Sequence, residues 1–348
     1  MWQIEGQDDA VRYLERSLRD GRLSHAYLIT GPPHVGKMTL AISLAQAVNC
    51  EGENPPCGQC QPCPRIASGK HADVRVIGLR TEESQSQTRT KTEISIDSIR
   101  EIQQAAYLPP YEGKTKVFII DGAERLSTEA ANCLLKVLEE PPPRVLLILL
   151  ATLEHLLLPT VTSRCQRLEL RPLSTPKVRE ILVKLHGTDP DRAELLAHLS
   201  EGCLGWALTA MQDDGPLERR EQDIAPMLEV VTSDYEKRLA LAASQAQRFA
   251  KSRKEMVGLL DLWLSYWRDV LMLKMGHAEA VTNIDHGAAL SSHTVALTTA
   301  EIRDAIDRIQ QAKNQISSNA NSRLAFEVLM LHLPKRDSIR PSAIASGV

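Results

Sequence analysis

The segment from Gly31 to Lys37, which reads Gly-Pro-Pro-His-Val-Gly-Lys, constrains the fold of this 348-residue chain more than any other feature. The apolar run 26–29 precedes it directly, and a helical pattern that begins near Leu40 follows it. Glycines let such a loop curl so that its backbone N–H groups face phosphate oxygens, and the N-terminus of the next helix adds positive potential. The segment therefore predicts a phosphate-binding loop between a buried strand and a helix, with Lys37 reaching the β and γ phosphates.

Further apolar runs indicate the sheet to which this loop belongs. Residues 117–120 and 145–150 are typical of buried strands, residues 73–77 are another candidate, and helical patterns lie between them. Strands that alternate with helices form a parallel sheet covered on both faces. The chemistry of such sheets lies at the carboxyl ends of the strands. We therefore expect an α/β P-loop domain with a parallel sheet.

The strand signals stop near residue 171, and the remaining pattern is helical. We expect an α/β domain over 1–171, a small helical domain over 172–214, a larger helical domain over 215–334 and a flexible polar tail over 335–348. Within the first domain, residues 81–93 are polar and without periodicity, which predicts an exposed loop. Apolar residues at helical spacing predict a core-facing helix in the third domain: Leu259, Leu260, Trp263, Trp267 and Leu271.

The composition is that of an ordinary globular protein, with 43% hydrophobic and 24% charged residues and a formal net charge of −3. No basic stripe stands out, so any contact with DNA is expected to be shared with partner chains. The N-terminus does not resemble a signal peptide, and the longest apolar run, 145–150, is too short to span a bilayer. We expect a cytoplasmic protein without membrane contact.

The candidate nucleotide site departs from a complete one at two positions. Met38 stands where a hydroxyl should ligate Mg²⁺, and a thioether is a poor ligand for that ion. Thr39 is rotated by about 100° around the helix and does not simply replace it. Asp121 fits the Mg²⁺-supporting aspartate at the end of its strand, but Gly122 follows it in place of a glutamate that would polarise water, and Glu124 is displaced by two residues. We predict a degenerate ATP and Mg²⁺ site, with weak binding and no hydrolysis, composed of Gly31, Gly36, Lys37, Thr39 and Asp121.

Four cysteines lie close together in a segment rich in proline and glycine, residues 50–63: Cys50, Cys57, Cys60 and Cys63. In a reducing compartment such crowding indicates a metal site rather than disulfides. Four thiolates close a tetrahedral shell around Zn²⁺ and leave no open position, so we predict a structural zinc site. An iron–sulfur cluster is the alternative that the same ligands allow, and His71 is a possible substitute ligand.

Together these features resemble a known family. Residues 21–28 lead into the phosphate loop, the four cysteines follow, Ser163-Arg164-Cys165 closes the α/β region, and residues 319–327 resemble a closing helix. The combination is similar to the clamp-loader ATPases of bacterial DNA polymerase III, members of the AAA+ class. The resemblance implies a RecA-like AAA+ domain, a helical lid and an all-α collar. It also implies gamma/tau and delta subunits, the sliding clamp and primer-template DNA as partners.

Three departures from the motor subunits of that family favour the delta-prime type. Met38 and Gly122 are two of them, and Gly205 stands where the motor has an arginine that senses the γ-phosphate. Arg164 is retained, and the resemblance implies that it reaches the ATP of a neighbouring subunit as an arginine finger. Two alternatives remain open: a gamma/tau-like motor that binds and hydrolyses ATP, and a stand-alone P-loop nucleotide-binding regulator.

Overall fold

The computed structural model describes residues 2–79, 81–82, 89–90, 93–248, 252–318 and 320–335. The chain divides into two compact units. The first contains residues 1–181 and 202–206, and the second contains residues 182–201 and 207–348. The finer division into domains at 172–214 and 215–334 stays a prediction, and residues 336–348 of the expected tail lie outside the described residues.

A five-stranded parallel sheet forms the centre of the first unit, with the strand order β2-β5-β6-β1-β7. Its strands are β1 (Ala26–Thr30), β2 (Val74–Ile77), β5 (Lys116–Asp121), β6 (Val145–Ala151) and β7 (Gln166–Glu169). The four predicted strands are confirmed. The edge strand β7 was not predicted, because three of its four residues are exposed and polar and form no apolar run. The expected fold class, an α/β domain with a parallel sheet followed by helices, is confirmed.

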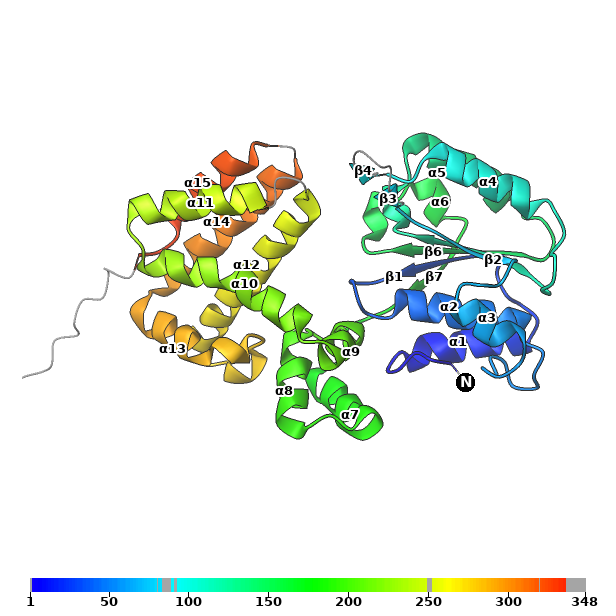
Figure 1. The fold of residues 1–348 in the computed structure, drawn as a ribbon, viewed down its shortest axis with the longest axis horizontal. Helices are drawn as coiled ribbons and strands as arrows, with labels where there is room; N and C mark the ends of the chain where they lie inside the picture. The colour runs from blue at the N-terminus through cyan, green and yellow to red at the C-terminus, as the bar shows by residue number, and fades with distance from the viewer. Residues whose placement is uncertain are drawn as a thin grey trace, which may run out of the picture. The chain divides into compact units, whose positions relative to one another are not determined.

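Helices cover both faces of this sheet (Figure 1). One layer contains α1 (Asp8–Arg19), α2 (Lys37–Asn49) and α3 (Pro62–Ala67), and the other contains α4 (Ile96–Ala106), α5 (Thr128–Glu139) and α6 (Pro159–Thr162). Successive strand residues point to opposite faces. Phe118 and Ile120 therefore lie in the core beneath α4 and α5, whereas Val117 and Ile119 lie in the core beneath α1 and α2.

The expected exposed loop at 81–93 is partly wrong. Thr81–Glu82 (β3) and Arg89–Thr90 (β4) form a short antiparallel pair. Two polar residues per strand are too few to show an alternating pattern, so sequence periodicity could not predict this pair. Residues 83–88 and 91–92 of the same prediction lie outside the described residues.

Helices form the second unit: α8 (Pro190–Leu199), α10 (Gly215–Thr232), α11 (Tyr235–Arg248), α12 (Arg253–Lys274), α13 (Gly287–Ala296), α14 (Thr299–Ser317) and α15 (Ser322–His332). The unit boundaries pass through α7 (Thr175–His186) and α9 (Leu204–Gln212). Trp263 and Trp267 of α12 are fully buried, and Trp263 packs edge-on against Phe326. The predicted core stripe is confirmed, with Leu271 only partly buried. None of the described helices is long and apolar enough to cross a membrane.

Candidate nucleotide and metal sites

The phosphate loop leaves β1 and enters α2 through two glycines whose backbone requires the absence of a side chain. Gly31 has φ +148°, and a Cβ there would lie 2.4 Å from the carbonyl oxygen of Leu170. Gly36 has φ +108° and caps the N-terminus of α2. Both residues support the predicted strand–loop–helix arrangement, because a residue with a Cβ rarely adopts these angles.

Lys37 turns its ammonium group back onto its own loop. Its Nζ donates to the carbonyl oxygens of Gly31 at 2.6 Å and Pro32 at 2.7 Å. Burial lowers the pKa of Lys37, and the nearby carboxylates of Glu124 and Asp121 oppose that shift. The structure thus places the carboxylate of Asp121 near Lys37, as predicted. The ammonium group of Lys37 is hydrogen-bonded to carbonyl oxygens of its own loop.

The other predicted nucleotide-site residues lie around this lysine. Met38 is partly buried and packs against the core beneath α1 and α2, and Thr39 is exposed in the first turn of α2. Asp121 is exposed at the end of β5, and the next residue, Gly122, has φ +75°. A glutamate at position 122 would have to adopt this left-handed backbone, which is unfavourable for any residue with a Cβ.

Glu124 is closer to the centre of the site than its place in the sequence indicated. Its Oε1 accepts the backbone N–H of Thr152, at the end of β6, at 3.3 Å. Its Oε2 is buried and has no hydrogen-bond partner in the described structure. The hydrogen bond between Thr152 and Glu124 could not be predicted from the sequence, because it depends on the pairing of β5 with β6 in the sheet.

Gly205 lies directly against the phosphate loop. Its backbone N–H donates to the carbonyl oxygen of His34 at 2.9 Å. A Cβ on Gly205 would lie 2.7 Å from that same oxygen. The family resemblance indicated that Gly205 stands at a position where motor subunits have an arginine. In this structure the backbone at Gly205 has no room for a side chain.

The four predicted metal-site cysteines come together. Their sulfur atoms all lie within 4.8 Å of one another, with Cys60 Sγ 3.8 Å from Cys50 Sγ and 3.4 Å from Cys63 Sγ. Tetrahedral ligation at about 2.3 Å per sulfur places the sulfurs about 3.8 Å apart, so the cluster fits a zinc ion. Cys50 Sγ accepts the N–H groups of Gly52 and Cys57, each at 3.3 Å. The N–H groups of Cys60 and Gln59 lower the pKa of Cys57 to about 6.

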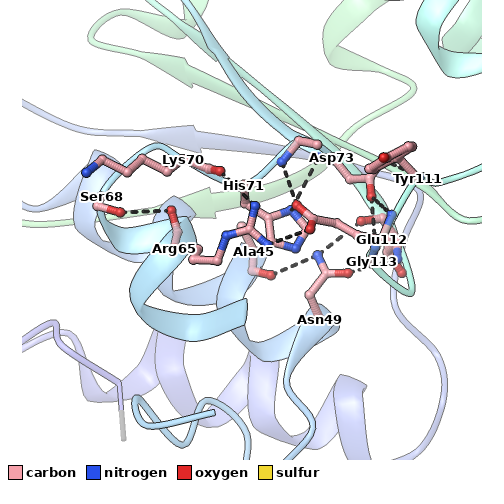
Figure 2. A network of polar contacts seen from close by, with 12 residues as sticks. Ala45, Asn49, Arg65, Ser68, Lys70, His71, Asp73, Tyr111, Glu112 and Gly113 are labelled. Carbon is pink, nitrogen blue, oxygen red and sulfur yellow. Dashed lines mark hydrogen bonds and ion pairs between the residues drawn. The ribbon is translucent and has the colours of Figure 1, made fainter. Parts of the chain in front are cut away.

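A polar network joins α3, which begins at the end of the cysteine segment, to the loop that enters β5 (Figure 2). Arg65 of α3 donates to Glu112 at 2.5 Å, and the other oxygen of Glu112 accepts the N–H of Ala72 at 2.9 Å. Lys114 Nζ donates to the carbonyl oxygen of Cys50, and Gln46 donates to that of Cys63 at 2.8 Å. The loop that enters β5 therefore holds the Cys50 end of the cysteine segment, and α2 holds the Cys63 end.

Asp73 fixes the same loop from the side of β2. Its carboxylate is 3% exposed and accepts the backbone N–H groups of Tyr111, Glu112 and Gly113, each at 2.8 Å (Figure 2). His71, the possible substitute ligand, is buried and accepts the N–H of Asp73 at 3.2 Å. The metal-ligand cluster that the described residues form contains the four cysteines and not His71.

Arg164 follows α6 on the exposed surface of the first unit. Its Nη2 lies 2.8 Å from Glu139 Oε1, and its Nη1 donates to the carbonyl oxygen of Thr160 at 3.0 Å. Glu169, five positions further along the chain, pairs instead with Arg171 at 2.9 Å. Glu139 ends α5, and only the packing of α5 against α6 brings it to Arg164.

Comparisons with known proteins identify the family. A model of the DNA polymerase III delta subunit matches residues 6–174, and a model of the C-terminal part of the delta subunit matches residues 236–335. The chain belongs to the DNA polymerase III clamp-loader family. This clamp-loader chain is 29% identical to DNA polymerase III subunit delta' of Bacillus subtilis (strain 168) over 333 residues, which cover 94% of this chain and 96% of the relative. The predicted resemblance to the delta-prime type is confirmed.

Tau subunits are also similar to this clamp-loader chain. It is 26% identical to tau of Bacillus subtilis over 95% of this chain, and 33% identical to tau of Escherichia coli (strain K12) over 70% of this chain. The matches span only 60% and 38% of these tau subunits. A gamma-subunit-related protein of Thermotoga maritima matches in structure with a TM-score of 0.45 and 20% identity, over 94% of this chain and 99% of that one.

Proposed function

We propose that this chain is a delta-prime-like subunit that helps a clamp loader place the sliding clamp on primed DNA in the bacterial cytoplasm, without hydrolysing ATP itself. The contact of Gly205 with His34 carries the proposal. It leaves no space for a phosphate-sensing arginine at that backbone position. Met38 and Gly122 remove two further groups that hydrolysis needs, a ligand for Mg²⁺ and a base for water.

We further propose that Arg164 serves the ATP site of a neighbouring gamma/tau subunit. Its side chain is 37% exposed, and a guanidinium makes paired hydrogen bonds to phosphate oxygens more readily than a lysine does. An arginine supplied in trans accelerates phosphoryl transfer by about 10³–10⁵ in well-studied systems. The exposed pair with Glu139 is weak enough to exchange for a phosphate partner.

We assign a structural role to the cysteine cluster, with one Zn²⁺ held by Cys50, Cys57, Cys60 and Cys63. Four sulfurs complete the tetrahedron, so this ion would have no open position for catalysis. Its contribution would be to fold the cysteine segment against the loop at Glu112 and Lys114.

A gamma/tau-like motor is the second candidate, and the similarity to tau subunits over 95% of the chain favours it. ATP turnover by the purified chain separates the two candidates. The delta-prime assignment predicts no turnover by the chain alone and restored clamp loading when it joins gamma/tau and delta subunits. Turnover that Lys37→Ala abolishes would assign the chain to the motor type instead. Failure to assemble with these subunits would favour the stand-alone regulator.

A further inference from the structure

A cavity lies at the opposite end of the sheet from the phosphate loop. It has a volume of about 400 Å³ and borders the amino ends of β1, β5 and β6. Its apolar side chains come from Leu18 near the end of α1, Leu23 in the segment between α1 and β1, Val48 of α2, and Pro142 in the turn before β6. A volume of this size is in the range of small-ligand sites, which are mostly apolar with a few placed polar groups.

Among the described residues, Arg144 is the only side chain with a permanent charge that lines this cavity. Its side chain is exposed and makes no hydrogen bond or ion pair within the described part of the chain. It follows three prolines, whose rings fix the backbone that presents it. Its carbonyl oxygen accepts the N–H of Lys116 at 2.8 Å, which anchors the turn to β5. The guanidinium therefore stands on a rigid support beside an apolar wall.

The backbone of Arg144 is left-handed, with φ +62°. Glycine adopts this conformation far more readily than arginine does, so the backbone conformation at position 144 is unfavourable for the arginine found there. Such outliers in the backbone are a reason to look for a function of the side chain.

The other polar groups around the cavity are already engaged. His25 Nε2 donates to the carbonyl oxygen of Leu138 at 3.1 Å, and Ser24 Oγ donates to that of Ala26 at 3.0 Å. Asn49 holds both backbone groups of Thr115, at 2.9 and 3.0 Å. No carboxylate of the described residues lines the cavity. One unpaired cation in a cavity of mixed lining, with polar backbone groups beside leucine, valine and proline side chains, complements a ligand with one negative charge and a short hydrocarbon body.

We propose that this cavity binds an aliphatic carboxylate, with the carboxylate on Arg144 and the hydrocarbon between Leu23, Val48 and Pro142. Arginine matches a carboxylate with two parallel hydrogen bonds. The same chemistry has two sources: the C-terminal residue of a polypeptide, or a free aliphatic acid. The site is separate from the phosphate loop and from the cysteine cluster, and it does not depend on the proposed function.

The test uses the full chain with isotope-labelled leucine and valine methyl groups. Three probes are titrated: an acetylated tripeptide that ends in leucine, the same tripeptide as its C-terminal amide, and octanoate. We expect the tripeptide acid or octanoate to shift the methyl resonances of Leu23 and Val48, and the amide to bind at least tenfold more weakly. Binding by the tripeptide acid alone identifies a chain end, and binding by octanoate alone identifies a free acid.

Arg144→Gly is the decisive variant, because glycine suits the left-handed backbone and the fold should persist. We expect it to reduce carboxylate affinity at least tenfold while the thermal midpoint stays the same or rises. Arg22→Ala is the matched control, since Arg22 is an exposed arginine near the cavity that does not line it. The proposal is wrong if no probe shifts these methyl groups, if acid and amide bind equally, or if Arg144→Gly binds as the unmodified chain does.

Discussion

Gly205 donates its backbone N–H to the carbonyl oxygen of His34 at 2.9 Å, so the first turn of α9 is bonded directly to the phosphate loop. A Cβ at Gly205 would approach that oxygen to 2.7 Å. We predict that Gly205→Ala lowers the free energy of unfolding by about 1–3 kcal/mol, because the turn must move to relieve the clash. Urea unfolding measures the difference.

Gly258→Ala is the matched control for this change. Gly258 lies inside α12, and a Cβ there meets nothing within 4 Å. Alanine in a helix interior is more favourable than glycine by roughly 0.5–1 kcal/mol, so this variant should be more stable. Equal effects of the two substitutions would show that α9 does not press against the loop.

The isolated chain should show no ATP turnover above background. Lys37→Ala should change nothing in that assay, because the ammonium group already binds Gly31 and Pro32. Met38→Thr combined with Gly122→Glu should also fail to restore turnover, since position 122 has φ +75° and Gly205 leaves no space for an arginine. A coupled phosphate-release assay measures all three proteins. Turnover that depends on Lys37 would contradict the account.

Metal removal should loosen the loop at 111–114. Elemental analysis of protein purified without chelator should give about one zinc per chain, and iron with a visible absorption band would instead favour an iron–sulfur cluster. Chelation, or Cys60→Ser, frees α3 and with it the contact of Arg65 with Glu112. We expect faster amide hydrogen exchange at 111–114 and unchanged exchange in β6. Unchanged exchange at 111–114 would show that the two parts are independent.

Asp73 gives the first unit a specific sensitivity to acid. Burial acts to raise its pKa, but the N–H groups of Glu112, Tyr111 and Gly113 outweigh burial and hold the pKa below its usual value. A carboxylate with a depressed pKa stabilises the fold above its unfolded pKa of about 3.9, and this contribution is lost as the pH falls through the folded value.

Asp73→Asn should therefore lower the free energy of unfolding at pH 7 by about 1–3 kcal/mol, since the amide replaces one acceptor oxygen with a donor. The difference from the unmodified chain should begin to shrink below about pH 4, where the carboxyl group of the unfolded chain becomes protonated, and should shrink further as the pH falls through the lower pKa of folded Asp73. Asp97→Asn, at an exposed surface pair, is the control and should have little effect. A difference that is constant between pH 7 and pH 3 would rule out titration of Asp73 as the cause.

The sequence predicted the elements that have a strong local pattern. β1 and β6 are continuous apolar runs, and the spacing of the four cysteines predicted their cluster. β7 was missed because an edge strand with exposed polar residues has no apolar signature. The pair of β3 and β4 was missed because it is too short for periodicity.

The contacts that define the sites depend on packing between segments far apart in the chain. Gly205 meets His34 across 171 positions, and Arg65 meets Glu112 across 47, which no local spacing rule anticipates. Arg164 pairs with Glu139 of α5, 25 positions before it, while Glu169, only five positions after it, pairs with Arg171. The sequence predicted which residues form the candidate sites, but it did not predict which distant residues they contact.

The central claim is that this chain does not hydrolyse ATP but supplies Arg164 to a neighbour that does. The most direct measurement is ATP turnover by a complex reconstituted from this chain, gamma/tau and delta, with clamp and primed DNA present. Arg164→Ala should assemble normally and reduce turnover at least tenfold, and Arg164→Lys should recover only part of it. Arg171→Ala, which also removes an exposed arginine paired with a glutamate, should leave turnover unchanged. Normal turnover with Arg164→Ala in an assembled complex would contradict the account.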